Sequence, residues 1–189
     1  AQSLGEQLSP VPFSSSIYLA AEAISQFGTD AQKTTYLSKL ASGELVGTLA
    51  VVESLDEPEA ERLATDYKGE NISGTKLLVP HGQYADIAVV LARGSDGPDM
   101  VIVDLAGVER TPVSVVAPTI AAATLEFDGT GAELLGVSGE GWRQLQSVYD
   151  RAAVLMAFEQ IGGASKALDM AVNYAKERYA FGRPIGSFQ

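Results

Sequence analysis

The apolar residues near the start of the chain recur at spacings of three and four, a pattern that predicts helix. The stretch from Ser14 to Phe27 carries one such apolar face. Gly28 ends this helix, and Thr29 begins a second one, with Gln32 at the spacing of a capping box. Gly43 closes the second helix. The apolar positions of the first stretch are Ile17, Ala20, Ala21, Ile24 and Phe27.

Between about Thr48 and Ser138 the pattern changes to period two or to short apolar runs, which predicts strands. The connections are rich in turn residues and mostly too short for crossover helices, so antiparallel pairing is expected. Such strands predict a small barrel or sandwich. The candidate strands are Leu45–Val52, Thr75–Val79, Ile87–Ala92, Met100–Leu105, Val113–Val116 and Thr124–Phe127.

One very long helix is predicted from Trp142 to about Tyr179, where there is no proline and the only glycines are Gly162 and Gly163. Its many small residues suit close packing against other helices, supplied by further chain or by another subunit. The fold class is therefore α+β multidomain: a helical segment over 1–47, an antiparallel β-barrel over 48–138, and the start of a C-terminal helical bundle over 139–189.

Composition excludes several classes of protein. With 13 Lys and Arg against 24 Asp and Glu, the net charge is −11, which disfavours nucleic acid as a partner. There is no cysteine and only one histidine, His81, so disulfides, thiolate chemistry and multi-histidine metal sites are excluded. No signal segment or membrane span is visible, and a cytoplasmic location is expected. Because the chain begins with Ala1 and stops just after a strongly patterned stretch, we expect a fragment.

The end of the long helix is the richest segment for chemistry. Its last turn carries Lys176 and Arg178, Phe181 and Gly182 then break the helix, and Pro184 prevents its continuation. On one interpretation this is a helix end whose arginine complements the dipole. On the other, an arginine beside an aromatic ring suits a pyrophosphate joined to a flat ring system.

These residues stand in a longer pattern that resembles the acyl-CoA dehydrogenase family. The sequence ERYAFGRPIGSFQ at 177–189 is similar to the signature after the first long helix of that family's C-terminal domain. FGTDAQKTTYLSKLASGE at 27–44 resembles the end of its N-terminal helical domain. Gly74-Thr75-Lys76 and LGVSGEG at 135–141 resemble its β-domain and the join that follows. The matches run in the family's order over nearly the whole chain.

The resemblance implies FAD-dependent desaturation of an acyl-CoA thioester between Cα and Cβ, with electron-transfer flavoprotein as the electron acceptor. It also implies a tetramer in which Arg178 and Phe181 reach the FAD of a neighbouring subunit, and in which Gln189 contacts the adenine side. The polar residue that usually precedes the phenylalanine is Ala180 here, so one hydrogen bond to the cofactor is expected to be absent.

The chain departs from the family where its β-domain would contact flavin. In place of Thr-Glu-Pro-Gly-Ala-Gly-Ser-Asp it has VESLDE at 52–57, with Val52 and Ser54 at family flavin positions and two acids that would repel a pyrophosphate. In place of Trp-Ile-Thr-Asn it has Leu78-Val79-Pro80-His81, and proline offers no donor. These changes put FAD binding by this β-domain in question. The acidic run from Glu53 to Glu61 is otherwise expected to be a solvated loop.

No catalytic base is visible in the sequence. In most relatives it lies beyond the position of Gln189, and in a minority it aligns with Ala152, next to an arginine position occupied by Ala153. Asp150 and Arg151 are shifted alternatives, but adjacent residues do not share a helix face. His81 is expected to be a loop residue rather than a catalyst.

Three hypotheses follow. The first is a catalytic acyl-CoA dehydrogenase subunit. The second is a partner subunit that has lost its own flavin pocket and lends Arg178 and Phe181 to FAD held mainly by another chain. Actinobacterial steroid-degrading members pair unlike subunits, and SPVPFS at 9–14 is similar to that group. The third is a flavin monooxygenase on the same scaffold, although no residue points to oxygen chemistry. The acyl chain and the choice between like and unlike subunits stay open.

Overall fold

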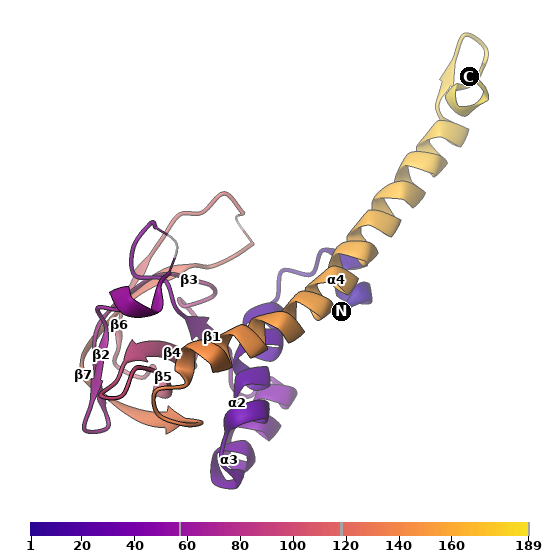
Figure 1. Cartoon of the computed structure of the whole chain (residues 1–189). Helices are drawn as coiled ribbons and strands as arrows, with labels where there is room; N and C mark the ends of the chain where they lie inside the picture. The colour runs from indigo at the N-terminus through magenta and orange to yellow at the C-terminus, as the bar shows by residue number, and fades with distance from the viewer. Residues whose placement is uncertain (57, 118, 189) are drawn as a thin grey trace. The chain divides into compact units, whose positions relative to one another are not determined.

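The computed structural model describes residues 1–56, 58–117 and 119–188 (Figure 1). The chain divides into a larger unit, Pro10–Ala152, and a smaller unit made of Ala1–Ser9 and the segment from Ala153 onward. Within the described residues, no helix is both long enough and apolar enough to cross a membrane. Each unit is described by itself below.

The larger unit begins with helices, as the spacing predicts. The predicted helix from Ser14 to Phe27 is present, but its first part, η1 (Ser14–Ala21), is a π-helix that continues into α2 (Glu22–Phe27). A spacing of three and four cannot distinguish the wider turn, in which two serines point inward: Ser15 lies against His81, and the Ser16 hydroxyl accepts from the Gly47 N–H at 3.0 Å. The wider turn is thus tied to the strands by its polar side chains.

Helix α3 (Asp30–Ser42) has the predicted capping box. The Thr29 hydroxyl accepts from the Gln32 N–H at 3.2 Å, and the Gln32 amide oxygen accepts from the Thr29 N–H at 3.0 Å. The Gln32 amide nitrogen also donates to the Leu134 carbonyl at 3.0 Å. Tyr36 donates to Glu133 at 2.9 Å, and burial together with that carboxylate raises the pKa of Tyr36 to about 12. The cap residue therefore also fixes the helix against the last long strand.

Seven strands form one sheet that closes on itself. The ring runs β4, β2, β3, β7 and β5 and returns to β4, while β1 pairs with β4 and β6 pairs with β7. Most pairings are antiparallel, but β1 and β2 both run parallel to β4. The long excursion between β1 and β4 makes parallel pairing possible. The strands are β1 (Gly47–Ala50), β2 (Asp66–Lys68), β3 (Asn71–Val79), β4 (Ile87–Arg93), β5 (Pro98–Asp104), β6 (Glu109–Pro112) and β7 (Ala123–Leu135).

The sequence predicts this barrel well except at its short strands. Val113–Val116 is wrong as a strand, because the strand in that region is β6, four residues earlier, where the sequence is polar and largely exposed. Strand β2 is missing from the prediction because three residues carry no alternation. The antiparallel expectation is wrong for the two pairs with β4. A short helix, η2 (Ala60–Arg62), lies in the excursion before β2.

Two hydrophobic cores explain why the central strands read as continuous apolar runs. Ile87, Val89 and Leu91 pack in the cluster that includes the helices, whereas Ala88 and Val90 pack in a second cluster with the other strands. Because successive side chains of a strand point to opposite faces, both faces of β4 are covered and every residue up to Ala92 is buried. One face of β4 thus packs against the helices, and the other face packs inside the barrel.

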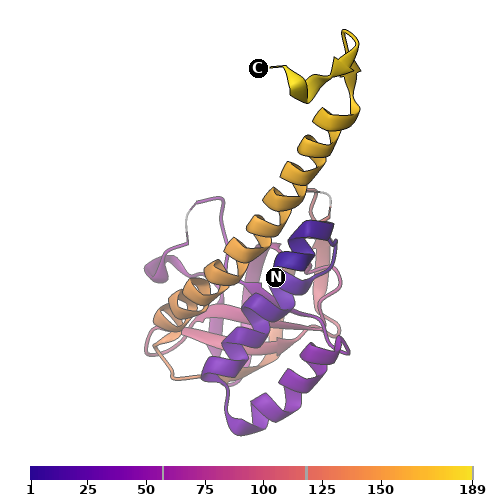
Figure 2. The same cartoon turned by 90° about the vertical axis from the view of Figure 1, so that its right-hand side faces the viewer.

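The predicted long helix is confirmed as α4 (Gly141–Glu177), drawn without interruption in both views (Figures 1 and 2). In the larger unit its first turns bury Leu145 and Val148 in the helical core. In the smaller unit it meets α1 (Gln2–Gln7), where a Cβ on Gly162 would overlap the Gln2 carbonyl oxygen. The two consecutive glycines of α4 therefore permit a close helix contact.

Candidate functional site

A β-hairpin follows α4 at the C-terminal end of the described chain. Strands β8 (Tyr179–Ala180) and β9 (Arg183–Pro184) pair antiparallel across Phe181 and Gly182. Both turn residues have positive φ, 51° for Phe181 and 82° for Gly182, as a type I′ turn requires. Phenylalanine is an unusual residue in that conformation, so the turn holds an aromatic ring where glycine or asparagine is the common choice.

The side chains of this hairpin face outward. Phe181 is 97% exposed, and the Arg178 side chain is exposed at the helix end and forms no ion pair within the part of the chain that the structure describes. The Arg178 backbone is fixed on both sides, since its N–H donates to the Tyr174 carbonyl and its carbonyl accepts from the Ile185 N–H, each at 2.8 Å. The corner thus presents an unpaired guanidinium and an exposed aromatic ring on a backbone held by hydrogen bonds.

Ala180 and Gln189 are the other two residues that the sequence relates to the cofactor. Ala180 lies in β8 and offers only backbone groups to a cofactor. Gln189 lies outside the described residues, so its predicted adenine-side contact stays a prediction. Of the three predicted cofactor-binding residues, Arg178 and Phe181 are therefore the two whose side chains the structure describes.

The segment after β1 contains a buried ion pair that the sequence analysis missed. The Lys76 Nζ lies 2.5 Å from Glu53 Oε1 and donates to the Val51 carbonyl at 3.2 Å, and the lysine side chain is 0% exposed. Glu53 also accepts from the backbone N–H groups of Ala64 and Thr65, at 2.6 and 3.1 Å. The expectation that Glu53 belongs to a solvated acidic loop is therefore wrong.

Burial and hydrogen bonding shift the pKa values of this pair. Burial raises the pKa of Glu53, but the hydrogen bonds from the Ala64 N–H, from Lys76 and from Thr65, together with the Lys76 charge, outweigh it and hold that pKa below its ordinary value. Burial lowers the pKa of Lys76, and Glu53 offsets part of that effect. One signal in the sequence was Lys76 itself, which lies an even number of residues after the buried Ile72 of β3 and so falls on the same inward face.

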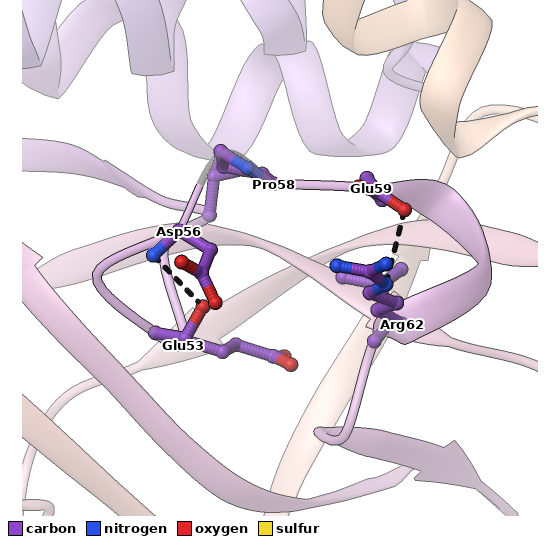
Figure 3. A pocket seen from close by; sticks show the side chains of 8 residues that line it. Glu53, Asp56, Pro58, Glu59 and Arg62 are labelled. Carbon is purple, nitrogen blue, oxygen red and sulfur yellow. Dashed lines mark hydrogen bonds and ion pairs between the residues drawn. The ribbon is translucent and has the colours of Figure 1, made fainter.

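The excursion after β1 also lines a pocket, shown in Figure 3. The Asp56 N–H donates to the Ser54 hydroxyl at 3.2 Å, and Arg62 is paired with Glu59 at 3.1 Å. Among the described lining residues Arg62 is thus neutralised by Glu59 and Glu53 by Lys76, so Asp56 is the acid that leaves the lining with negative charge, which repels a pyrophosphate. Glu57 lies outside the described residues. The lining residues are Val51, Glu53, Ser54, Asp56, Pro58, Glu59, Arg62 and Leu63.

The turn after β3 lacks donors at the family's flavin positions. Leu78 has a φ of 51°, in a stretch where the pairing of β3 with β7 shifts register. The Pro80 carbonyl accepts from the Thr48 hydroxyl at 2.6 Å, and Pro80 itself has no N–H. Val52 has no polar side-chain atom, and its carbonyl already accepts from the Leu77 N–H at 2.7 Å. The side chains of Val52, Leu78 and Pro80 therefore offer FAD no hydrogen bond.

His81 lies in that turn, as predicted, but it is buried. Its Nδ1 is 3.0 Å from the Ser15 hydroxyl, which also donates to the Pro12 carbonyl at 3.1 Å. The imidazole is 7% exposed, and burial lowers its pKa from 6.5. A neutral His81 therefore links the π-helix to the turn, and among the described residues no carboxylate is bonded to it as a catalytic partner would be.

Acid is expected to weaken the fold through His81. Its folded-state pKa is depressed, so its contribution is present above the unfolded value of 6.5 and is lost as the pH falls below that value. Urea unfolding should show a free energy that falls between pH about 6.5 and about 5, above the range where carboxylates protonate. His81→Gln should flatten this interval, since the chain has no other histidine. An equal slope in both proteins would contradict the assignment.

The two positions of α4 at which a minority of the family would carry the base and its neighbouring arginine hold alanines. Ala152 is buried, Ala153 is exposed, and neither can accept a proton. Asp150 is exposed, and Arg151 is paired with Glu22 at 2.6 Å. No group of three or more potential metal ligands occurs in the described ranges. That this helix carries no catalytic carboxylate stays a prediction.

Two family models match this chain. The model described as "Acyl-CoA dehydrogenase, N-terminal domain" matches residues 2–44, and the model described as "Acyl-CoA dehydrogenase, C-terminal domain" matches residues 139–189. Among curated proteins, acyl-CoA dehydrogenase IpdE2 of Mycobacterium tuberculosis is 31% identical over 100% of this chain and 46% of its own length. The chain thus spans about half the length of such relatives.

Solved structures agree with the fold. A steroid acyl-CoA dehydrogenase, the Tcur3481–Tcur3483 G363A variant, is 31% identical with a TM-score of 0.82 over 100% of this chain and 51% of that chain. The ChsE4–ChsE5 complex from M. tuberculosis is 27% identical with a TM-score of 0.83 over 98% of this chain and 51% of that chain. The helical segment, barrel and long helix therefore occur together in known proteins.

Proposed function

This chain belongs to the acyl-CoA dehydrogenase family, an oxidoreductase class, and from that premise we propose that its protein takes part in FAD-dependent α,β-desaturation of an acyl-CoA thioester. The observation that carries the proposal is the C-terminal corner, with an exposed Phe181 in a type I′ turn and an unpaired Arg178 at the helix end. FAD, when bound, supplies the acceptor for hydride.

The corner fits a flavin dinucleotide chemically. A guanidinium donates to phosphate oxygens in a planar fork, and an exposed ring packs against a flat heterocycle. In the proposed role Arg178 binds the pyrophosphate and Phe181 covers the ring system, so both residues bind and orient the cofactor and neither moves a proton. The base is proposed to lie beyond Gln189.

The test is anaerobic addition of saturated acyl-CoA thioesters to the full-length protein, purified together with any subunit that accompanies it. Loss of the oxidised flavin band with formation of the enoyl-CoA product supports the function. A flavin-containing assembly that no acyl-CoA reduces, over a range of chain lengths and steroid-derived thioesters, would refute it.

A second candidate is favoured by the flavin-position residues of the larger unit. Val52, Ser54, Leu78 and Pro80 offer little to FAD, and the neighbouring pocket is acidic. We propose as this alternative that the chain is a non-catalytic or half-site partner, which lends Arg178 and Phe181 to FAD held mainly by a related subunit. Its similarity to structures named for two chains each supports the idea.

Colour separates the two candidates. A partner subunit purified alone should be colourless and should turn yellow only after co-expression with a homologue that holds the flavin. Stoichiometric flavin absorbance in the protein purified alone would reject the alternative and leave the catalytic subunit.

The finer assignments are part of the same proposal. We propose a cytoplasmic homo- or hetero-tetramer, electron-transfer flavoprotein as electron acceptor, and a place in fatty-acid β-oxidation or steroid degradation. We also retain as proposals the domain limits 1–47, 48–138 and 139–189. The similarity to a steroid acyl-CoA dehydrogenase supports the steroid thioester among these substrates.

A further inference from the structure

A second arginine, Arg183, lies in strand β9 of the exposed hairpin and has no role in the function proposed above. The Arg183 guanidinium carbon lies 4.0 Å from the centroid of the Phe188 ring, over its face. Phe188 in turn meets Phe181 edge to face, with ring centroids 6.3 Å apart and planes at 80°. The three side chains form a continuous stack that ends at the exposed ring of Phe181.

The base of this stack is anchored to the rest of the hairpin. The Ile185 N–H donates to the Arg178 carbonyl at 2.8 Å, and the Ser187 hydroxyl donates to the Pro184 carbonyl at 2.7 Å. At Gly186, a Cβ would lie 3.0 Å from the Ala175 carbonyl oxygen, so η3 (Ile185–Ser187) approaches the last turns of α4 closely. Phe188 therefore stands on a fixed support.

The tip has no such support of its own. Phe181 is 97% exposed, and a phenylalanine with a φ of 51° is not held in place by backbone preference. Phe188 is the one ring that pairs with it among the described residues, and Phe188 is itself 40% exposed. The position of the Phe181 ring thus depends on Phe188, whose face is in turn covered by the Arg183 guanidinium.

We propose that Arg183 is a positioning residue. By stacking on Phe188 it fixes the ring against which Phe181 stands, and so presents Phe181 in one orientation to the flavin ring system held by a neighbouring subunit. The inference rests on the proposed function for its ligand, but its structural part concerns this chain alone. A cation over an aromatic face is favourable even at exposed sites, which gives the arrangement a physical basis.

The test compares Arg183→Ala, Arg183→Lys and the matched control Lys176→Ala, which removes an exposed cation from the last turn of α4 outside the stack. In NMR spectra of the full chain, the Arg183 side-chain protons should show upfield ring-current shifts, and Arg183→Ala should raise backbone mobility at Phe181 and Gly182. In the assembled complex, flavin release should become about two- to fivefold faster in Arg183→Ala, partly recover in Arg183→Lys, and stay unchanged in the control.

Each outcome decides the matter. A looser tip with faster flavin release, recovered in part by lysine, supports the proposal. Unchanged tip mobility, or a looser tip with unchanged flavin release, overturns it while leaving the proposed function intact. Normal tip order with fast release in Arg183→Ala would assign Arg183 a direct contact to phosphate instead. Absence of flavin from every assembly of the wild-type chain would refute the proposed function, and this inference would fall with it.

Discussion

Glu53→Ala is expected to lower the free energy of unfolding of this protein by about 3–5 kcal/mol. The substitution leaves the Lys76 ammonium, 0% exposed, with only the Val51 carbonyl as a partner. It also removes the acceptor for the Ala64 and Thr65 N–H groups, which join the excursion after β1 to the start of β2. Urea unfolding at neutral pH, followed by circular dichroism, measures the loss.

Two variants make this result specific. Glu61→Ala removes an exposed carboxylate from the same excursion and should change stability by no more than about 0.5 kcal/mol. Adding Lys76→Met to Glu53→Ala removes the uncompensated charge and should restore part of the loss. If Glu53→Ala were as stable as Glu61→Ala, the buried ion pair would have no energetic role.

Arg178→Ala is expected to weaken flavin retention in the assembled complex by roughly 10- to 100-fold, the loss typical of a charge-assisted hydrogen bond. The chain itself should fold normally, because the side chain is exposed and unpaired within the described residues. Flavin content after extended dialysis and the dissociation constant of re-added FAD measure the effect.

The control for this result is Arg143→Ala, at the other end of α4. Arg143 is exposed and paired with Glu140 at 2.5 Å, so its removal takes away the same charge without touching the hairpin. Retention that is equal in Arg178→Ala, Arg143→Ala and the wild-type protein would remove Arg178 from the cofactor contact.

The sequence predicts those parts of the fold that depend on local rules. The capping box at Thr29, the helix end at Gly43 and the uninterrupted helix predicted from Trp142 follow from backbone chemistry within a few residues, and the structure has all three, the long helix running from Gly141 to Glu177. The apolar runs at 87–92 and 100–105 are long enough to identify buried strands. Where the local sequence pattern is unambiguous, the secondary structure that it predicts is the one found in the folded chain.

The features that depend on distant contacts could not be read in the same way. The two serines of the π-helix look like ordinary helix residues until His81 and the Gly47 N–H reach them from the turn after β3 and from β1. Glu53 looks solvated until Lys76, 23 residues further on, is brought beside it. Strand β2 has no pattern of its own, since its neighbours alone make it a strand.

The candidate site also has one part that the sequence indicates and one part that only the structure shows. A motif of consecutive residues was enough to point to Arg178 and Phe181, and the type I′ turn explains how the ring becomes exposed. The stack of Arg183 on Phe188 needed coordinates, because a guanidinium and a ring five residues apart do not reveal their contact in the sequence.

The most direct test is a crystal structure of the full-length protein, assembled with its partner subunit and FAD. The account predicts that the Phe181 ring lies against the isoalloxazine of a flavin bound mainly by a neighbouring protomer, with the Arg178 guanidinium at hydrogen-bonding distance from its pyrophosphate. A structure in which the hairpin at 179–184 faces solvent, with no neighbouring protomer or flavin in contact, would contradict it.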